Sequence, residues 1–198
     1  MSGEIQFILA SGSPRRKDLL ERMGLRFAVE VPHADETLLE GESPGEHTLR
    51  LARDKAGLVA AKHRQSWVLA ADTAVVIDGE ILGKPSDREH AFAMLSRIQG
   101  REHTVVTAFC IQRADPPSRT CRAVESRVRM RGLTPQEIRW YINTNEPMDK
   151  AGSYAVQGIG ASIVREVSGS YTNVVGLPLA EVIEEMERLE VLRLLGND

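Results

Sequence analysis

The feature that most constrains the fold is an apolar run that ends in a small-residue turn followed by a helix start. Ile5 to Leu9 predicts a buried strand, and Ser11, Gly12 and Ser13 favour a turn after it. Pro14 suits the first position of a helix whose N-cap is Ser13. This order of strand, turn and helix is typical of α/β domains, and the exposed N–H groups of such a helix start can hold an anion.

Two arginines occupy the first turn of this predicted helix, Arg15 and Arg16. The helix dipole disfavours a cation there by about 0.3–1 kcal/mol. A bound polyphosphate would compensate for that cost. The alternative is an ordinary turn whose arginines point into water, and this stretch alone leaves both interpretations open.

A second constraint is a carboxylate inside the most apolar strand candidate, Trp67 to Ile77. Asp72 and Thr73 interrupt that run near its middle. An unpaired ionised carboxylate in such a strand costs several kcal/mol, so Asp72 must meet a cation, a metal ion or several N–H donors. We prefer a functional carboxylate over a structural Asp bonded to a nearby lysine or backbone, because such paired groups concentrate at functional sites.

Further charged residues occur at the ends of predicted elements. A strand over Phe27 to Val31 leads to a loop that contains Asp35 and Glu36. A capping box at Ser43 predicts a helix in which Lys55 lies beside the apolar stripe, where most lysines extend to solvent.

Turn signals define the next elements. Asp78 and Gly79 predict a hairpin. Lys84 then lies in the loop before a helix that a capping box of Ser86 and Glu89 would open.

The second half of the chain adds two strands and a glycine-rich segment. The strands are expected over Thr104–Ile111 and Ala123–Met130, and Thr134, Pro135 and Glu137 are expected to begin a short helix. The segment 149–176 is permissive enough to wrap closely around a ligand. The last helix, after Pro178, carries an apolar stripe that we assign to the core, with a homodimer face as the alternative.

Composition excludes several classes of protein. The net charge of −3 gives no basic field for nucleic acid, and no apolar run approaches the length that spans a membrane.

Cys110 and Cys121 lack the spacing of a zinc site and are expected as small apolar side chains on neighbouring strands in a reducing compartment. The expected localisation is cytoplasmic. The five histidines are given no chemical role, with a reservation for His103.

Several motifs in the same order resemble the Maf nucleotide pyrophosphatases over nearly the whole chain. They read ASGSPRRKDLL, ADTAVVIDGEILGKPSDREHAFAML, the His103–Thr107 stretch, DKAGSYAVQGIG and GSYTNVVGLPL. The resemblance implies a single domain over residues 1–198. Its expected fold is α/β, related to the inosine triphosphate pyrophosphatases, with a mixed twisted sheet flanked by helices and a central cleft between two lobes.

The resemblance also implies an activity, which is hydrolysis of a nucleoside triphosphate between its α and β phosphates with a divalent cation. Asp72 is expected as the proton acceptor, and Arg15, Thr73 and Gln157 are expected to govern substrate choice. The DKAGSYAVQG motif resembles the branch that acts on dTTP and UTP. The alternatives are the branch that prefers 7-methyl-GTP and a non-catalytic, nucleotide-sensing regulator of cell division.

These motifs give a hypothesis for the whole site. Five residues are expected to surround the phosphates: Ser11, Arg15, Arg16, Lys55 and Lys84. Glu36 and Asp72 are expected to hold magnesium or manganese, and Asp35 could replace Glu36 as a ligand.

Overall fold

The computed structural model describes residues 6–192, so Ile5 of the predicted first strand lies outside the described residues. The strands are β1 (Phe7–Ala10), β2 (Phe27–Val29), β3 (Val68–Ile77), β4 (Glu80–Leu82), β5 (Glu102–Ala114), β6 (Pro117–Met130) and β7 (Val164–Ser168). The α-helices are α1 (Pro14–Arg22), α2 (Pro44–Ala60), α3 (Arg88–Ile98), α4 (Pro135–Asn143), α5 (Tyr171–Val175) and α6 (Leu179–Arg188). Three short 3₁₀ helices follow α4, at Glu146–Asp149, Ala151–Ser153 and Gly158–Ser162.

The strands form one mixed sheet, as predicted. Its strand order is β2-β1-β3-β5-β6-β7, and β4 pairs with β3. β1 runs parallel to both β2 and β3, with Ile8 opposite Ala28 and Val68. The hairpin predicted at Asp78 and Gly79 joins β3 to the antiparallel β4, and both residues have positive φ, at 54° and 80°.

The described chain folds into two compact units. Unit 1 contains the residues up to Asp72, then Thr107–Ala123, and the C-terminal part from Gly176. Unit 2 contains Thr73–Val106 and Val124–Val175. Strands β3, β5 and β6 contribute residues to both units, and the boundary in β3 falls between Asp72 and Thr73.

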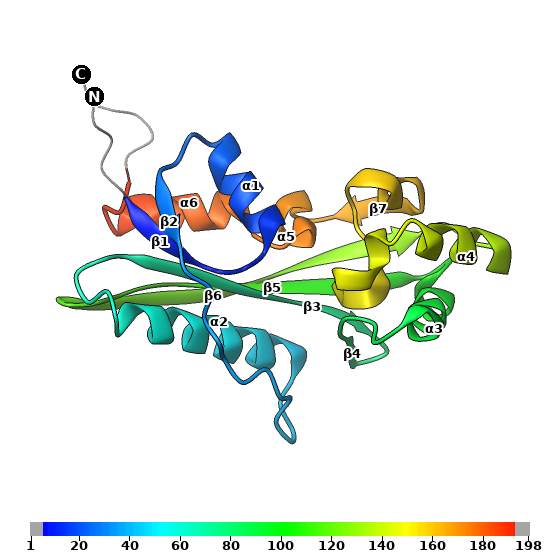
Figure 1. Cartoon of the computed structure of the whole chain (residues 1–198), viewed down its shortest axis with the longest axis horizontal. Helices are drawn as coiled ribbons and strands as arrows, with labels where there is room; N and C mark the ends of the chain where they lie inside the picture. The colour runs from blue at the N-terminus through cyan, green and yellow to red at the C-terminus, as the bar shows by residue number, and fades with distance from the viewer. Residues whose placement is uncertain (1–5, 193–198) are drawn as a thin grey trace. The chain divides into compact units, whose positions relative to one another are not determined.

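In unit 1 helices cover both faces of the strands. Helices α1 and α6 lie on one face and α2 lies on the other (Figure 1). On the α2 side, Ala52, Ala56 and Val59 pack against alternate strand residues such as Ile8 and Ala70. In α6 the apolar stripe is buried, with Val182 and Met186 fully inaccessible, which confirms its assignment to the core.

In unit 2 the core is built from α3, α4 and the strands beside them. Leu95 and Ile98 of α3 pack with Ile138 and Tyr141 of α4, and all of these side chains are buried. Helix α4 begins after Thr134 as predicted, and a capping box opens it, with Thr134 and Glu137 exchanging hydrogen bonds.

Two local predictions were wrong. Asp87, not Ser86, caps α3, because the Asp87 carboxylate accepts the His90 N–H at 2.8 Å while the Ser86 hydroxyl bonds to Asp87 itself. Cys110 and Cys121 lie on neighbouring strands as expected, but they form a disulfide. Because the two thiols are paired, these cysteines do not indicate a reducing compartment.

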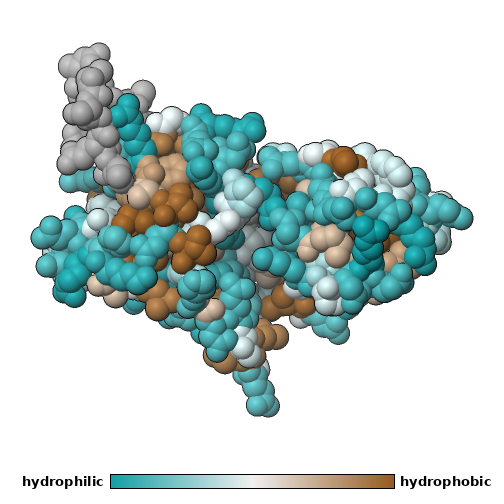
Figure 2. Space-filling view, in the orientation of Figure 1, coloured by the Kyte–Doolittle hydropathy of each residue, from teal (hydrophilic) through white to brown (hydrophobic). Residues whose placement is uncertain are grey.

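Hydrophobic surface in unit 1 gathers at the edge of the sheet. Val29 and Val31 are 45% and 54% exposed, and Figure 2 shows hydrophobic atoms where β2 lies.

Within residues 6–192, no helix is both long enough and apolar enough to cross a bilayer.

Candidate active site

The first turn of α1 is organised by two serines and one arginine, all in unit 1. The Ser13 hydroxyl caps the helix by accepting the Arg16 N–H at 3.5 Å. The buried Ser11 hydroxyl accepts hydrogen bonds from the Ser13 N–H and from Arg16 Nη1, both at 3.2 Å. Arg16 Nε donates to the Gly176 carbonyl at 2.8 Å, so the guanidinium is anchored rather than extended into solvent.

Lys55 joins two of the predicted carboxylates. Its ammonium lies 2.7 Å from Asp72 Oδ1 and 2.6 Å from Glu36 Oε1. The Lys55 and Asp72 side chains are only 11% and 14% exposed, whereas Glu36 is 62% exposed. The cation that the apolar strand required is therefore Lys55, which α2 directs toward β3 instead of toward solvent.

Arg16 belongs to the same group of charges. Burial lowers the pKa of Arg16, the negative charges of Asp72 and Glu36 raise it, and the positive charge of Arg15 lowers it. We call Arg16, Glu36, Lys55 and Asp72 the charged cluster. The structure thus brings four predicted site residues together, with Ser11 bonded to one of them.

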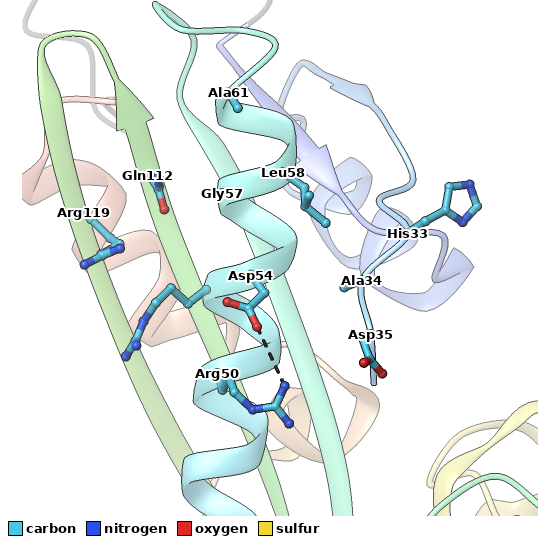
Figure 3. Close-up of a pocket in the computed structure, with 11 residues that line it drawn as sticks. His33, Ala34, Asp35, Arg50, Asp54, Gly57, Leu58, Ala61, Gln112 and Arg119 are labelled. Atoms are coloured by element: carbon cyan, nitrogen blue, oxygen red, sulfur yellow. Dashed lines mark ion pairs between the residues drawn. The ribbon is translucent and has the colours of Figure 1, made fainter. Parts of the chain in front are cut away.

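The geometry distinguishes Glu36 from Asp35, which the sequence left as alternatives. The Asp35 carboxylate accepts hydrogen bonds from the N–H and hydroxyl of Thr37, at 2.9 and 2.6 Å, and these bonds lower its pKa. Asp35 lines a different feature, an open groove of about 580 Å³ that runs over α2 (Figure 3). Of the two carboxylates, only Glu36 contacts Lys55.

The charged cluster offers carboxylate oxygens, which suit a hard cation, but only two side chains supply them. Within residues 6–192, no three His, Cys, Asp or Glu side chains lie close enough together to hold a metal ion. Glu36 and Asp72 supply two carboxylates on either side of one ammonium. Magnesium is commonly held by one or two carboxylates together with substrate phosphates, so this pair fits such an ion.

Of the remaining predicted residues, Arg15 lies in the first turn of α1 in unit 1, and the other three belong to unit 2. Thr73 follows Asp72 in β3, and Lys84 is exposed in the loop after β4. The loop of Lys84 is tied to the DKAG motif, because the Gly152 N–H donates to the Gly83 carbonyl at 3.0 Å. Gln157 is half-buried, and no hydrogen bond of its side chain is found within residues 6–192.

Sequence reasoning missed two residues that organise the segment around Gln157. Glu146 accepts hydrogen bonds from the backbone of Ile159 and Gly160, at 3.0 and 2.7 Å, and from the Tyr141 hydroxyl at 2.7 Å. The signal available in the sequence was a carboxylate placed just before a glycine-rich segment, whose N–H groups need acceptors.

His103 is buried and structural. Its Nε2 lies 2.7 Å from the Tyr154 hydroxyl, and burial lowers the pKa of His103 to about 4. The side chain is therefore neutral at pH 7 and contributes to the unit 2 core, which answers the reservation about His103.

Comparison with known proteins decides the family. The family model described as "Maf-like protein" matches residues 6–189, nearly all of the described chain. The chain belongs to the Maf family. The charged cluster of this Maf protein is built from the SPRR and ADT motifs together with Glu36 and Lys55.

Similar Maf proteins from bacteria carry one name, "dTTP/UTP pyrophosphatase". The relative from Syntrophus aciditrophicus is 46% identical over 192 residues, covering 97% of this chain and 94% of the relative. The relative from Desulfotalea psychrophila is 49% identical, covering 90% of this chain and 92% of the relative. The relative from Myxococcus xanthus is 48% identical and covers 91% of each chain.

Proposed function

We propose that this protein hydrolyses dTTP and UTP to the nucleoside monophosphate and pyrophosphate. Three Maf relatives that carry the corresponding name are between 46% and 49% identical to it over at least nine-tenths of the chain. The observation that carries the proposal is the pairing of Asp72 with Lys55 within the electrostatic reach of Arg16. We further propose that it acts in the cytoplasm.

The cations of unit 1 are suited to a triphosphate. Arg16 is held by Ser11 and Gly176, so its guanidinium is oriented before a ligand arrives. Lys55 adds a compact charge, and Arg15 and Lys84 are proposed as further phosphate contacts. A triphosphate would also relieve the unfavourable placement of arginines at a helix start.

Asp72 is the proposed proton acceptor. In hydrolysis, the oxygen of water bonds to the α-phosphorus, the bond from that phosphorus to the bridging oxygen breaks, and pyrophosphate leaves. The water must lose a proton, and an ionised carboxylate can accept it. Lys55 supplies an opposite charge 2.7 Å from Asp72 Oδ1.

Magnesium or manganese is the proposed cofactor. Glu36 and Asp72 would hold it, and when bound it would neutralise phosphate charge and favour deprotonation of water. Lys55, which lies between these carboxylates, would then be available to a phosphate oxygen.

Substrate choice is assigned to Arg15, Thr73 and Gln157, as the family resemblance implies. The Gln157 side chain has one amide donor group and one carbonyl acceptor, which match the N–H and carbonyl groups on the edge of uracil or thymine. Its lack of a hydrogen bond within residues 6–192 is consistent with an amide kept for a ligand.

The decisive test combines one substitution with a panel of substrates. Asp72→Asn keeps the shape of the side chain and removes its charge, so pyrophosphate release from dTTP should fall by about 1,000-fold or more. Asp54→Asn is the matched control, because Asp54 lies on α2 with a side chain 49% exposed and only a 3.8 Å ion pair to Arg50. Near-normal turnover by Asp72→Asn would remove Asp72 from the mechanism.

The substrate panel separates the proposal from its alternatives. Wild-type protein with manganese is incubated with dTTP, UTP and 7-methyl-GTP, and pyrophosphate is measured. Preference for 7-methyl-GTP would assign the other branch of the family. Tight binding of nucleotides without release of pyrophosphate would favour the sensing regulator.

A further inference from the structure

The segment around Gln157 is held from both sides by one hydrogen-bonded pair, Glu146 and Tyr141. After Gln157, the Glu146 carboxylate accepts the N–H groups of Ile159 and Gly160 at 3.0 and 2.7 Å. Before Gln157, the Tyr141 hydroxyl accepts the N–H of Ala155 at 3.1 Å. The two side chains are also bonded to each other, because the Tyr141 hydroxyl donates to Glu146 Oε1 at 2.7 Å.

Tyr141 is a rigid part of this arrangement. Its side chain is fully buried in α4, within the core of unit 2. Burial and the hydrogen bond to Glu146 raise the pKa of Tyr141, so the hydroxyl keeps its proton and remains a donor. Through these hydrogen bonds, Tyr141 and Glu146 fix the backbone on both sides of Gln157 relative to the core helix α4.

Gly158 and Gly160 are required because the backbone passes very close to the side chains of Glu146 and Tyr141. A Cβ atom on Gly160 would collide with the Ala155 carbonyl and lie 2.6 Å from the Tyr141 hydroxyl. A Cβ atom on Gly158 would collide with Glu146 Oε2, and Gly158 also has a φ of +63°. Only glycine lets the backbone approach the carboxylate this closely.

We propose that Glu146, acting with Tyr141, is a positioning residue that sets nucleobase discrimination through Gln157. This inference rests on the proposed function, because it takes Gln157 as the residue that reads the base. A side-chain amide distinguishes uracil from cytosine only if its donor and acceptor are fixed within hydrogen-bonding geometry. Glu146 supplies that restraint without contacting the substrate.

The test must separate positioning from a general loss of stability. Glu146→Gln retains the size of the side chain but replaces one acceptor oxygen by a donor, which opposes the backbone N–H groups. We expect the ratio of kcat/KM for UTP over CTP to fall about tenfold or more, through KM, with kcat for UTP within about threefold.

Glu137→Gln is the matched control in the same unit. Glu137 also accepts three hydrogen bonds, from the N–H and hydroxyl of Thr134 and from Arg131, at 2.7, 3.0 and 2.9 Å. The two bonds with Thr134 cap α4, and none of the three involves the segment around Gln157. The control should lose stability in urea unfolding and keep the UTP over CTP ratio of the wild type.

A double-mutant cycle shows whether Glu146 acts through Gln157. In a Gln157→Ala background, Glu146→Gln should change the UTP over CTP ratio no further. If Glu146→Gln does not fold, Tyr141→Phe serves instead, because it leaves both backbone hydrogen bonds to Glu146 in place. An unchanged ratio in the folded variant, or an equal change in Glu137→Gln, overturns the inference.

Binding measurements keep this inference distinguishable from the proposed function. The ratio of Kd values for UTP and CTP is measured by calorimetry for the wild type and each variant. If the wild type binds UTP over CTP but releases no pyrophosphate, the proposed function fails while a lower ratio in Glu146→Gln still supports positioning. A wild type that does not discriminate between UTP and CTP overturns the inference.

Discussion

The charged cluster of unit 1 and the segment around Gln157 in unit 2 are built in opposite ways. In the charged cluster, side chains of opposite charge pair with one another, and each carboxylate lies beside a cation. Around Gln157, backbone N–H groups are held by one carboxylate and one hydroxyl. We therefore expect the charged cluster to respond to changes of charge, and the segment around Gln157 to changes of shape.

After Asp72→Asn, the largest loss of activity is expected from removing the central cation of the charged cluster. Lys55→Gln leaves Asp72 and Glu36 without their shared ammonium, so pyrophosphate release from dTTP should fall by about 100- to 1,000-fold. Lys62→Gln is the control, because Lys62 follows α2 with a side chain 67% exposed. Activity of Lys55→Gln within about threefold of the wild type would contradict a role for charge in unit 1.

A purely steric change should act on the second region. Gly160→Ala places a methyl group against the Ala155 carbonyl and the Tyr141 hydroxyl, and should lower the free energy of unfolding by about 2–4 kcal/mol. Gly57→Ala is the matched control, because a Cβ there meets nothing within 4 Å and a helix favours alanine by about 1 kcal/mol. Equal stability of the two variants in urea would show that the segment can relax.

Acidification should weaken unit 2 through His103. The pKa of this buried histidine is lowered from 6.5 to about 4, so between these values the unfolded chain binds more protons than the folded one. Its contribution is fully present above pH 6.5 and is lost as the pH falls toward 4. At pH 5 the loss is about 2 kcal/mol, since each tenfold change in proton affinity corresponds to about 1.4 kcal/mol.

The measurement compares wild type with His103→Gln. Urea unfolding at pH 7.5 and pH 5 should show a smaller loss of stability in the variant, by about 2 kcal/mol. Identical pH dependence in both proteins would mean that His103 takes up its proton without unfolding.

The smallest effect is expected at the cap of α1. Ser13→Ala removes the acceptor of the Arg16 N–H and should lower the free energy of unfolding by about 1 kcal/mol. Pyrophosphate release should fall less than about tenfold, because Arg16 keeps its bonds to Ser11 and Gly176. A loss of activity as large as that of Lys55→Gln would mean that the backbone of the helix start, and not the cationic side chains, binds the phosphates.

The elements that sequence predicted correctly are those with strong local signals. Ser13 and Pro14 begin α1, Ser43 and Thr134 form capping boxes, and Asp78 with Gly79 makes the hairpin. The cap of α3 was misassigned because Ser86 and Asp87 are both good N-caps in adjacent positions, and local chemistry does not choose between them.

The residues alone show that Asp72 needs a partner, because burying a carboxylate in an apolar strand is costly in any fold. That the partner is Lys55, and that Glu36 rather than Asp35 shares it, follows from the folded chain, because these contacts join residues 17 or more positions apart. The same is true of Glu146, whose hydrogen bonds reach 13 and 14 positions along the chain to glycine-rich backbone. Local propensity specifies caps and turns, whereas contacts between distant residues depend on the tertiary fold of the whole chain.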